Sequence, residues 1–215
     1  HRGCGRSGPA GPGASVRAMA GDVLRLMNHL EIDRAHLIGH SLGGYIAQEL
    51  AADHADHVDK LVLVSTAEVS SGRNRRLFED FYRQLREEGY SQAWFQQWAP
   101  WLFSPERCAD SRFVKAFVRR AASHTRFQSA EWFKDQIDAI AAFDSRGRLG
   151  AVRAETLVLE GKDDRLVLPD EARALAEEIS GSRYRLLEGV GHSIHIEDPK
   201  LFVREVLEFL TEPAA

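Results

Sequence analysis

The sequence predicts an α/β fold, in which a mostly parallel sheet is flanked by helices and interrupted by an inserted group of helices. Short apolar runs of strand length alternate with amphipathic segments of helical period, as expected for parallel strands joined by crossover helices. A serine between two glycines follows the first apolar run directly. Residues 67–145 break the alternation, because they contain helical stripes and no convincing strand.

Composition limits the function classes. With 215 residues, of which 44% are hydrophobic, the chain can bury one substantial core. The net charge of -4 and the lack of a basic tract argue against a nucleic-acid partner or a membrane surface, and no apolar run approaches bilayer length. Cys4 and Cys108 lack the spacing of a metal site or a disulfide framework. We therefore expect a cytoplasmic protein that acts on a small molecule.

The first elements alternate as this fold requires. Apolar residues at helical spacing predict a helix over about 14–30, and a short buried strand is expected at Ala35–Ile38. An amphipathic helix is expected at Gly44–Ala52. The run Val58–Val64 is almost continuously apolar, which indicates a strand covered on both faces.

The middle of the chain is predicted to be a helical cap over the sheet. Its apolar residues form three helical stripes, which begin at Leu77, Phe113 and Trp132. The expected domain organisation is therefore a core built from residues 1–66 and 146–215, with a cap over residues 67–145.

The last part of the chain returns to alternating strands and helices. Strands are expected at Thr156–Leu159 and Tyr184–Leu187, with a helix at Asp170–Ile179 between them. Asp198 is the expected N-cap of a final helix that has Pro199 in its first turn. In such a parallel sheet, ligand chemistry belongs at the carboxyl ends of the strands.

The segment Gly39–Gly43 reads Gly-His-Ser-Leu-Gly and has the pattern of a nucleophile elbow. A serine on a sharp turn between strand and helix projects its hydroxyl out of the sheet, and glycines let the two elements approach closely. Ser41 is therefore the candidate nucleophile. The amide of Leu42, at the positive end of the following helix, is the candidate oxyanion donor.

A serine nucleophile needs an imidazole base and a carboxylate that orients the base. Asp163 and Asp164 follow the strand at 156–159, and Gly191-His192 follows the strand at 184–187. The chain order serine, aspartate, histidine is the one expected on this architecture. The candidate catalytic residues are Ser41, Asp164 and His192.

Together these motifs resemble the α/β-hydrolase fold superfamily, in the lidded branch of enol-lactonases, aminoacrylate hydrolases and C-C bond hydrolases. The resemblance implies that Asp164, three positions after Gly161, is the acid. It implies that His192, followed by the segment Glu197–Pro199, is the base. The opening segment Arg2–Ser7 is similar to a glycine-rich loop of the family. No cofactor and no metal are implied, and serine at position 41 disfavours a haloalkane dehalogenase, whose nucleophile is an aspartate.

Rival residues remain for some roles. Asp163 and Glu68 are alternative acids, and His195 shares a loop with His192 but lacks the preceding glycine. Aromatic side chains at helical spacing usually form a core of their own. A cap above a serine elbow must nevertheless present some apolar surface to the substrate. The candidate substrate-binding residues are His40, Trp94, Trp98 and Trp132.

The sequence also departs from the family pattern. A second oxyanion amide normally comes from a loop with a His-Gly motif after the third strand, and no such motif occurs here. The first strands of the family would precede His1. We therefore expect that the sheet is completed either by a preceding N-terminal segment of a longer hydrolase or by a partner chain in a homo-oligomer.

The expected function is that of a serine hydrolase that cleaves a small carboxylic ester, lactone or related acyl compound. One alternative is a C-C bond hydrolase of dienoic ketones that uses the same three residues. Another is a truncated chain without catalytic activity, which serves as a binding module or has no function.

Overall fold

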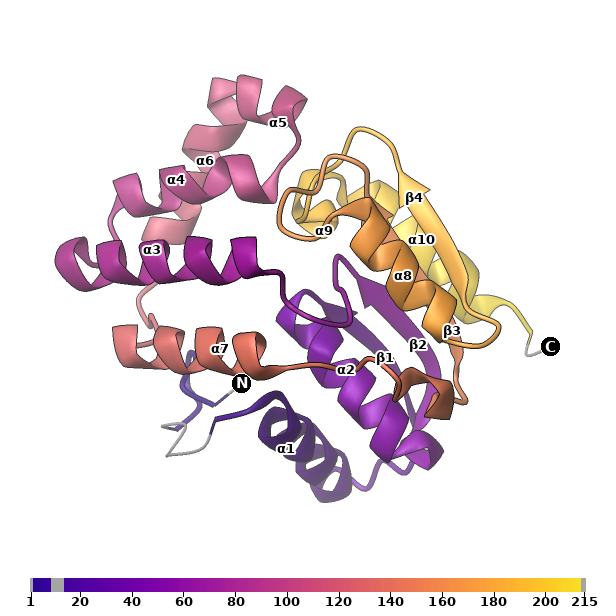
Figure 1. The fold of residues 1–215 in the computed structure, drawn as a ribbon. Helices are drawn as coiled ribbons and strands as arrows, with labels where there is room; N and C mark the ends of the chain where they lie inside the picture. The colour runs from indigo at the N-terminus through magenta and orange to yellow at the C-terminus, as the bar shows by residue number, and fades with distance from the viewer. Residues whose placement is uncertain (1, 9–13, 214–215) are drawn as a thin grey trace.

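The computed structural model describes residues 2–8 and 14–213. The opening segment Arg2–Ser7 lies within the described residues, and positions 9–13 lie outside them. The described residues form an α/β fold around one parallel sheet, as the sequence predicted (Figure 1).

The sheet has four strands in the order β1-β2-β3-β4, and each neighbouring pair is parallel. Residues 61–64 of β2 are fully buried, in agreement with the continuous apolar run of the sequence. Since all four strands are parallel, the loops that follow them all lie at the carboxyl-terminal end of the sheet. The bounds of the strands are Ala35–His40 (β1), Val58–Val64 (β2), Glu155–Gly161 (β3) and Arg183–Leu187 (β4).

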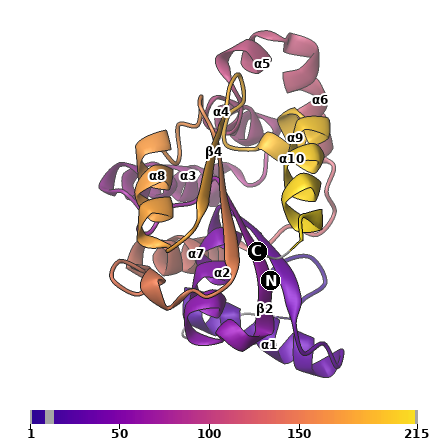
Figure 2. The ribbon, with the colours of Figure 1, turned by 90° about the vertical axis from the view of Figure 1, so that its right-hand side faces the viewer.

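Helices cover both faces of the sheet. Figure 2 shows α8 and α10 on opposite sides of it. One apolar cluster joins α2 and α8 to β2 and β3, and a second joins α9 and α10 to the other face. Helix α1 packs on α2. The bounds are Val16–His29 (α1), Leu42–Asp53 (α2), Pro169–Glu178 (α8), Ile194–Glu197 (α9) and Pro199–Thr211 (α10), with short 3-10 turns at Ala55–His57 and Leu149–Ala151.

Five helices lie between β2 and β3 and form a helical insertion beside the carboxyl ends of the strands (Figure 1). Each begins with an N-cap side chain that accepts a backbone hydrogen bond, which explains where the helices start. Within the described residues, no helix has the length and apolar character needed to cross a bilayer. The bounds are Gly72–Glu88 (α3), Gln92–Leu102 (α4), Pro105–Ala109 (α5), Ser111–Ala122 (α6) and Ala130–Ala142 (α7).

Strand β1 differs from its prediction in burial. The sequence indicated a buried strand, but the Ile38 side chain is 50% exposed. The physical reason is position, because β1 is the edge strand among the described residues and pairs with β2 alone. The strand is also longer than expected and continues to His40, directly before the serine.

Candidate active site

Ser41 lies between the end of β1 and the start of α2, with φ 53° and ψ -118°. A positive φ is unfavourable for a residue with a side chain and persists only where neighbours enforce it. The neighbouring strand does so here, since the Ser41 amide donates to the carbonyl of Val64 at 2.9 Å. The Thr66 hydroxyl donates to the Ser41 carbonyl at 3.1 Å. The turn therefore holds the serine in the geometry of a nucleophile elbow.

Two glycines make this turn possible. A Cβ atom at Gly39 would lie 2.4 Å from the carbonyl oxygen of Gly43. A Cβ atom at Gly44 would lie 2.5 Å from Cβ of Thr66. Both distances are far below van der Waals contact, so β1, α2 and the loop after β2 approach one another only because these positions lack side chains.

The candidate oxyanion donor stands at the first position of α2. The amide of Leu42 makes no hydrogen bond within the described part of the chain. The first amides of a helix lack partners inside the helix and carry its positive end, so they attract developing negative charge. Leu42 and Ser41 both line the same pocket.

Asp164 and His192 are in direct contact. The Nδ1 atom of His192 lies 2.7 Å from Oδ2 of Asp164, and the other carboxylate oxygen accepts the amides of Leu166 at 2.7 Å and Val167 at 3.0 Å. Three donors thus fix the carboxylate. With its Nδ1–H donated to Asp164, the imidazole keeps Nε2 as an acceptor, which is the tautomer that a general base needs.

The loops that carry these two residues are joined through their backbones. The amide of Lys162 donates to the carbonyl of Leu187 at 2.8 Å, and the amide of Asp163 donates to the carbonyl of Val190 at 3.0 Å. A Cβ atom at Gly161 would lie 2.4 Å from the carbonyl oxygen of Gly191. The two loops therefore approach each other closely at Gly161, and a residue with a side chain would not fit there.

His40 connects the serine turn to the loop of His192. Its Nε2 atom donates to the carbonyl oxygen of His192 at 2.9 Å, and the two rings lie 4.8 Å apart between centroids. Burial, reinforced by the nearby His192, lowers the pKa of His40 to about 3. His40 therefore stays neutral at physiological pH. The structure forms no hydrogen bond between the Ser41 hydroxyl and the His192 ring, both of which it describes.

A second buried carboxyl group lies next to Asp164. Glu160, at the end of β3, is fully buried, and its Oε1 atom accepts the amide of Gly161 at 2.8 Å. Its Oε2 atom is buried without a hydrogen-bond partner. Burial, and then the neighbouring Asp164 carboxylate, raise the pKa of Glu160 well above its usual value. Burial and the nearby carboxylate therefore both favour the protonated form of Glu160.

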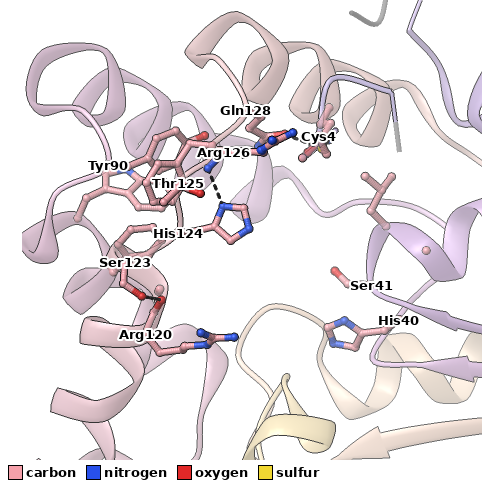
Figure 3. Close-up of a pocket in the computed structure, with 18 of the residues that line it drawn as sticks. Cys4, His40, Ser41, Tyr90, Arg120, Ser123, His124, Thr125, Arg126 and Gln128 are labelled. Carbon is pink, nitrogen blue, oxygen red and sulfur yellow. Dashed lines mark hydrogen bonds between the residues drawn. The ribbon is translucent and has the colours of Figure 1, made fainter. Parts of the chain in front are cut away.

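A pocket of about 1110 Å³ opens between the serine turn and the helical insertion (Figure 3). Of the predicted substrate-binding residues, His40 and Trp94 line it. Trp98 and Trp132 do not: the Trp98 ring stacks on Phe81 at 3.9 Å between centroids, and the backbone of Gly3 packs against the Trp132 ring. Those two rings belong to the packing of the insertion and of the opening loop.

Sequence reasoning missed the basic side of this pocket. Arg120, His124 and Arg126 come from the end of α6 and the segment that follows it, and they line the pocket. Figure 3 shows Arg120 and His124 on the side of the pocket opposite Ser41. The described lining contains no aspartate and no glutamate. The basic end of α6 was visible in the sequence, but nothing local distinguished these side chains from solvated surface charges.

The rival acids lie elsewhere. The carboxylate of Glu68 faces Glu178 and Arg146, and burial is the main cause that raises its pKa. Asp163 contributes a backbone amide to the junction of the two loops, whereas the hydrogen bond to His192 is made by Asp164. His195 lies 4.7 Å from the His40 ring between centroids, and burial lowers its pKa. Asp164 and His192 are therefore the acid and imidazole that the structure brings together.

Comparisons with known proteins identify the family. The family model described as "alpha/beta hydrolase fold" matches residues 1–199. The RutD protein of Agrobacterium fabrum, named for carbamate hydrolysis, is 31% identical to the chain over 98% of the chain and 80% of the relative.

Solved structures show the same likeness. The enol-lactonase from Burkholderia xenovorans LB400 superposes with a TM-score of 0.85 and 32% identity, covering 98% of this chain and 78% of that one. A malate-bound thermophilic esterase from Thermogutta terrifontis gives a TM-score of 0.82 and 27% identity over 97% of this chain and 76% of that one. The chain therefore belongs to the α/β-hydrolase fold family and is a hydrolase.

Proposed function

We propose that the chain cleaves a small carboxylic ester, lactone or related acyl compound, with Ser41 as nucleophile, His192 as base and Asp164 as the acid that orients the base. The observation that carries this proposal is the buried hydrogen bond between Asp164 and His192. His40, next to the strained Ser41 turn, makes a hydrogen bond to the carbonyl of His192 and so links that turn to the same loop. The resemblance in sequence to an enol-lactonase and an esterase supports the same bond type.

In the first half of the reaction, Oγ of Ser41 attacks the substrate carbonyl carbon while Nε2 of His192 takes the hydroxyl proton. The carbonyl oxygen becomes negative and is stabilised by the amide of Leu42 at the start of α2. His192 then returns the proton to the departing alkoxide oxygen, which leaves an acyl group on Ser41.

In the second half, a water molecule gives a proton to Nε2 of His192 and attacks the acyl carbon. Collapse of the second tetrahedral intermediate releases the carboxylic acid, and the proton returns to Oγ of Ser41. Asp164 stabilises the imidazolium formed in both halves. Because Ser41 and His192 are not hydrogen-bonded in the free chain, this mechanism requires the contact to form when substrate binds, as is common for catalytic hydrogen bonds.

The pocket favours certain acyl compounds. The apolar part of the pocket wall is formed by Trp94, Phe95 and Phe127. Arg120 places a positive charge opposite the serine. In the absence of a carboxylate in the described lining, a neutral or anionic substrate fits better than a cationic one. We further propose that the helical insertion acts as the cap over this pocket, since most of the lining residues belong to it.

Hydrolysis of short p-nitrophenyl esters and of small lactones tests the proposal. The wild-type chain is expected to turn over at least one of these classes, and Ser41→Ala is expected to lower kcat by at least about 10⁴-fold without unfolding the protein. Cleavage of a dienoic ketone without ester or lactone hydrolysis would instead favour C-C bond hydrolysis. Equal activity of folded wild type and Ser41→Ala would reject Ser41 as the nucleophile.

A further inference from the structure

Glu197 ties the loop of His192 to the helical insertion. It is the last residue of α9 and is 4% exposed. Its carboxylate accepts the amide of Gly191 at 3.0 Å, the amide of Ser104 at 3.1 Å, and the hydroxyl of Ser104. Gly191 directly precedes His192, whereas Ser104 lies between α4 and α5. One carboxylate therefore joins two segments that are far apart in the sequence.

The two backbones are also in direct contact. The amide of Ser193 donates to the carbonyl of Leu102 at 2.8 Å. A Cβ atom at Gly191 would lie 2.8 Å from the carbonyl carbon of Phe103, so this position accepts glycine alone without a shift of the chain. Residues 102–104 of the insertion thus fit against residues 191–193, on both sides of the His192 backbone. A movement of one segment requires a movement of the other.

The partners of Glu197 set it apart from Glu49 and Glu205, two other buried glutamates. Glu49 pairs with Arg17 and Arg148, and Glu205 pairs with Arg185 and Arg204. Among the described residues, the carboxylate of Glu197 instead takes two backbone amides and one hydroxyl, with no arginine or lysine side chain.

A buried carboxylate is costly unless it is hydrogen-bonded, and these three donors satisfy it. Backbone amides cannot change rotamer as an arginine side chain can. The network around Glu197 therefore fixes the relative position of two loops more firmly than a surface ion pair would.

We infer that Glu197 is a positioning residue for His192, through which the helical insertion sets the place of the proposed base. The inference rests on the proposed function, because only a catalytic His192 makes its position matter for turnover. The bond from His192 to Asp164 restrains one side of the imidazole, and the network of Glu197 restrains the backbone on the other. Small displacements of a reacting group lower rates strongly, since a misplacement of about 1 Å costs about 100-fold.

Three variants separate this role from general stability. Glu197→Gln keeps the shape but replaces one acceptor oxygen by an NH2 group, so that at least one of the three donors loses its acceptor. Ser104→Ala removes the hydroxyl donor, which is also the N-cap of α5, and changes no residue in the loop of His192. Glu205→Gln is the matched control, because Glu205 is a similarly buried glutamate (6% exposed) whose arginine partners lie away from the pocket.

Two measurements do not depend on a substrate. The first is amide hydrogen exchange at Gly191 and at residue 104, and the second is the downfield proton resonance of His192 Nδ1–H. In Glu197→Gln we expect exchange to be at least about tenfold faster at both amides and the resonance to move or broaden. Ser104→Ala is expected to change Gly191 and His192 in the same direction but less, and Glu205→Gln is expected to change neither.

Turnover supplies the third measurement. With an ester that the wild type cleaves, Glu197→Gln is expected to lower kcat about tenfold or more, with KM within about twofold. If folded Glu197→Gln and Ser104→Ala keep the resonance, the exchange rates and kcat of the Glu205→Gln control, the inference is overturned. If Glu197→Gln does not fold, Ser104→Ala decides alone. A failure of the proposed function would look different from a failure of this inference. In that case the folded wild type would neither cleave esters nor react with a serine probe at Ser41.

Discussion

The imidazole of His192 and the carboxylate of Asp164 form a 2.7 Å hydrogen bond in which the two side chains are only 3% and 0% exposed. A charge-assisted bond of this length in a site shielded from water fixes the ring firmly. Because Asp164 is also held by the amides of Leu166 and Val167, it presents one oxygen to the ring in a set direction. This pair is the part of the proposed machinery that is already assembled in the free chain.

Replacement of Asp164 by asparagine is expected to lower kcat for ester hydrolysis by about 10⁴-fold, because an amide in that place favours the wrong imidazole tautomer. The asparagine carbonyl can still accept the two backbone amides, so the fold is expected to persist. Asp163→Asn is the matched control and is expected to keep kcat within about twofold. Steady-state kinetics and circular dichroism check both variants. A large loss in Asp163→Asn with an active Asp164→Asn would assign the acid to Asp163.

Substitution by alanine is expected to destabilise the protein at Gly39 but not at Gly43, although both glycines flank Ser41. Gly39→Ala places Cβ 2.4 Å from the carbonyl oxygen of Gly43, and it is expected to lower the free energy of unfolding by about 1–3 kcal/mol or more. Gly43→Ala meets no atom within 4 Å and lies in α2, so it is expected to be neutral or to stabilise the protein slightly. Urea denaturation measures both. Equal stability of the two variants would contradict the close approach in the turn.

The raised pKa of Glu160 predicts a pH-dependent difference in stability between the wild type and Glu160→Gln. Its folded-state pKa is raised, so the folded chain keeps a proton that the unfolded chain releases above about pH 4.5. The wild type therefore loses stability as the pH rises above that value, whereas Glu160→Gln has no such proton to lose. The free energy of unfolding of Glu160→Gln minus that of the wild type is therefore expected to increase from pH 5 to pH 8, by at most about 1.4 kcal/mol per pH unit.

Chemical denaturation of the wild type and Glu160→Gln at pH 5, 6.5 and 8 tests this sign. A difference that stays constant over this range, or that shrinks as the pH rises, would show that Glu160 is ionised in the folded chain. Glu205→Gln serves as the control, because arginine hydrogen bonds lower the pKa of Glu205 despite an opposing effect of burial.

The basic side of the pocket predicts a preference among substrates. Arg120→Gln is expected to raise KM for an ester with a carboxylate on its acyl group by about tenfold, and to leave KM for a neutral ester of the same length within twofold. Arg119→Gln, at the neighbouring position of α6 and outside the pocket lining, is the control. An equal effect of Arg120→Gln on both esters would mean that the arginine does not contact the charge of the substrate.

Local patterns predicted the fold class and the loops that carry the candidate residues. The turn at Ser41 and the loop at Gly161 could be predicted because two backbones approach closely at these places, and only glycine fits there. The alternation of apolar runs and amphipathic segments likewise predicted the parallel sheet, which the structure and the family match confirm.

Features set by packing between distant segments were not predictable in this way. Whether a tryptophan of the insertion faces the pocket, as Trp94 does, or stacks on a neighbour, as Trp98 does, depends on how the helices are rotated. The exposure of Ile38 follows from the place of β1 at the sheet edge. The partners of Glu197 lie at positions 104 and 191, which no local pattern connects.

Covalent labelling tests the central claim most directly. The purified wild type is incubated with a fluorophosphonate probe, and the modified residue is located by peptide mass spectrometry, with folded Ser41→Ala and His192→Ala chains treated in parallel. The account predicts one adduct, on Ser41, that is absent from Ser41→Ala and forms at least about 100-fold more slowly in His192→Ala. A folded wild type without an adduct at Ser41, or one labelled at the same rate when His192 is replaced, would contradict it.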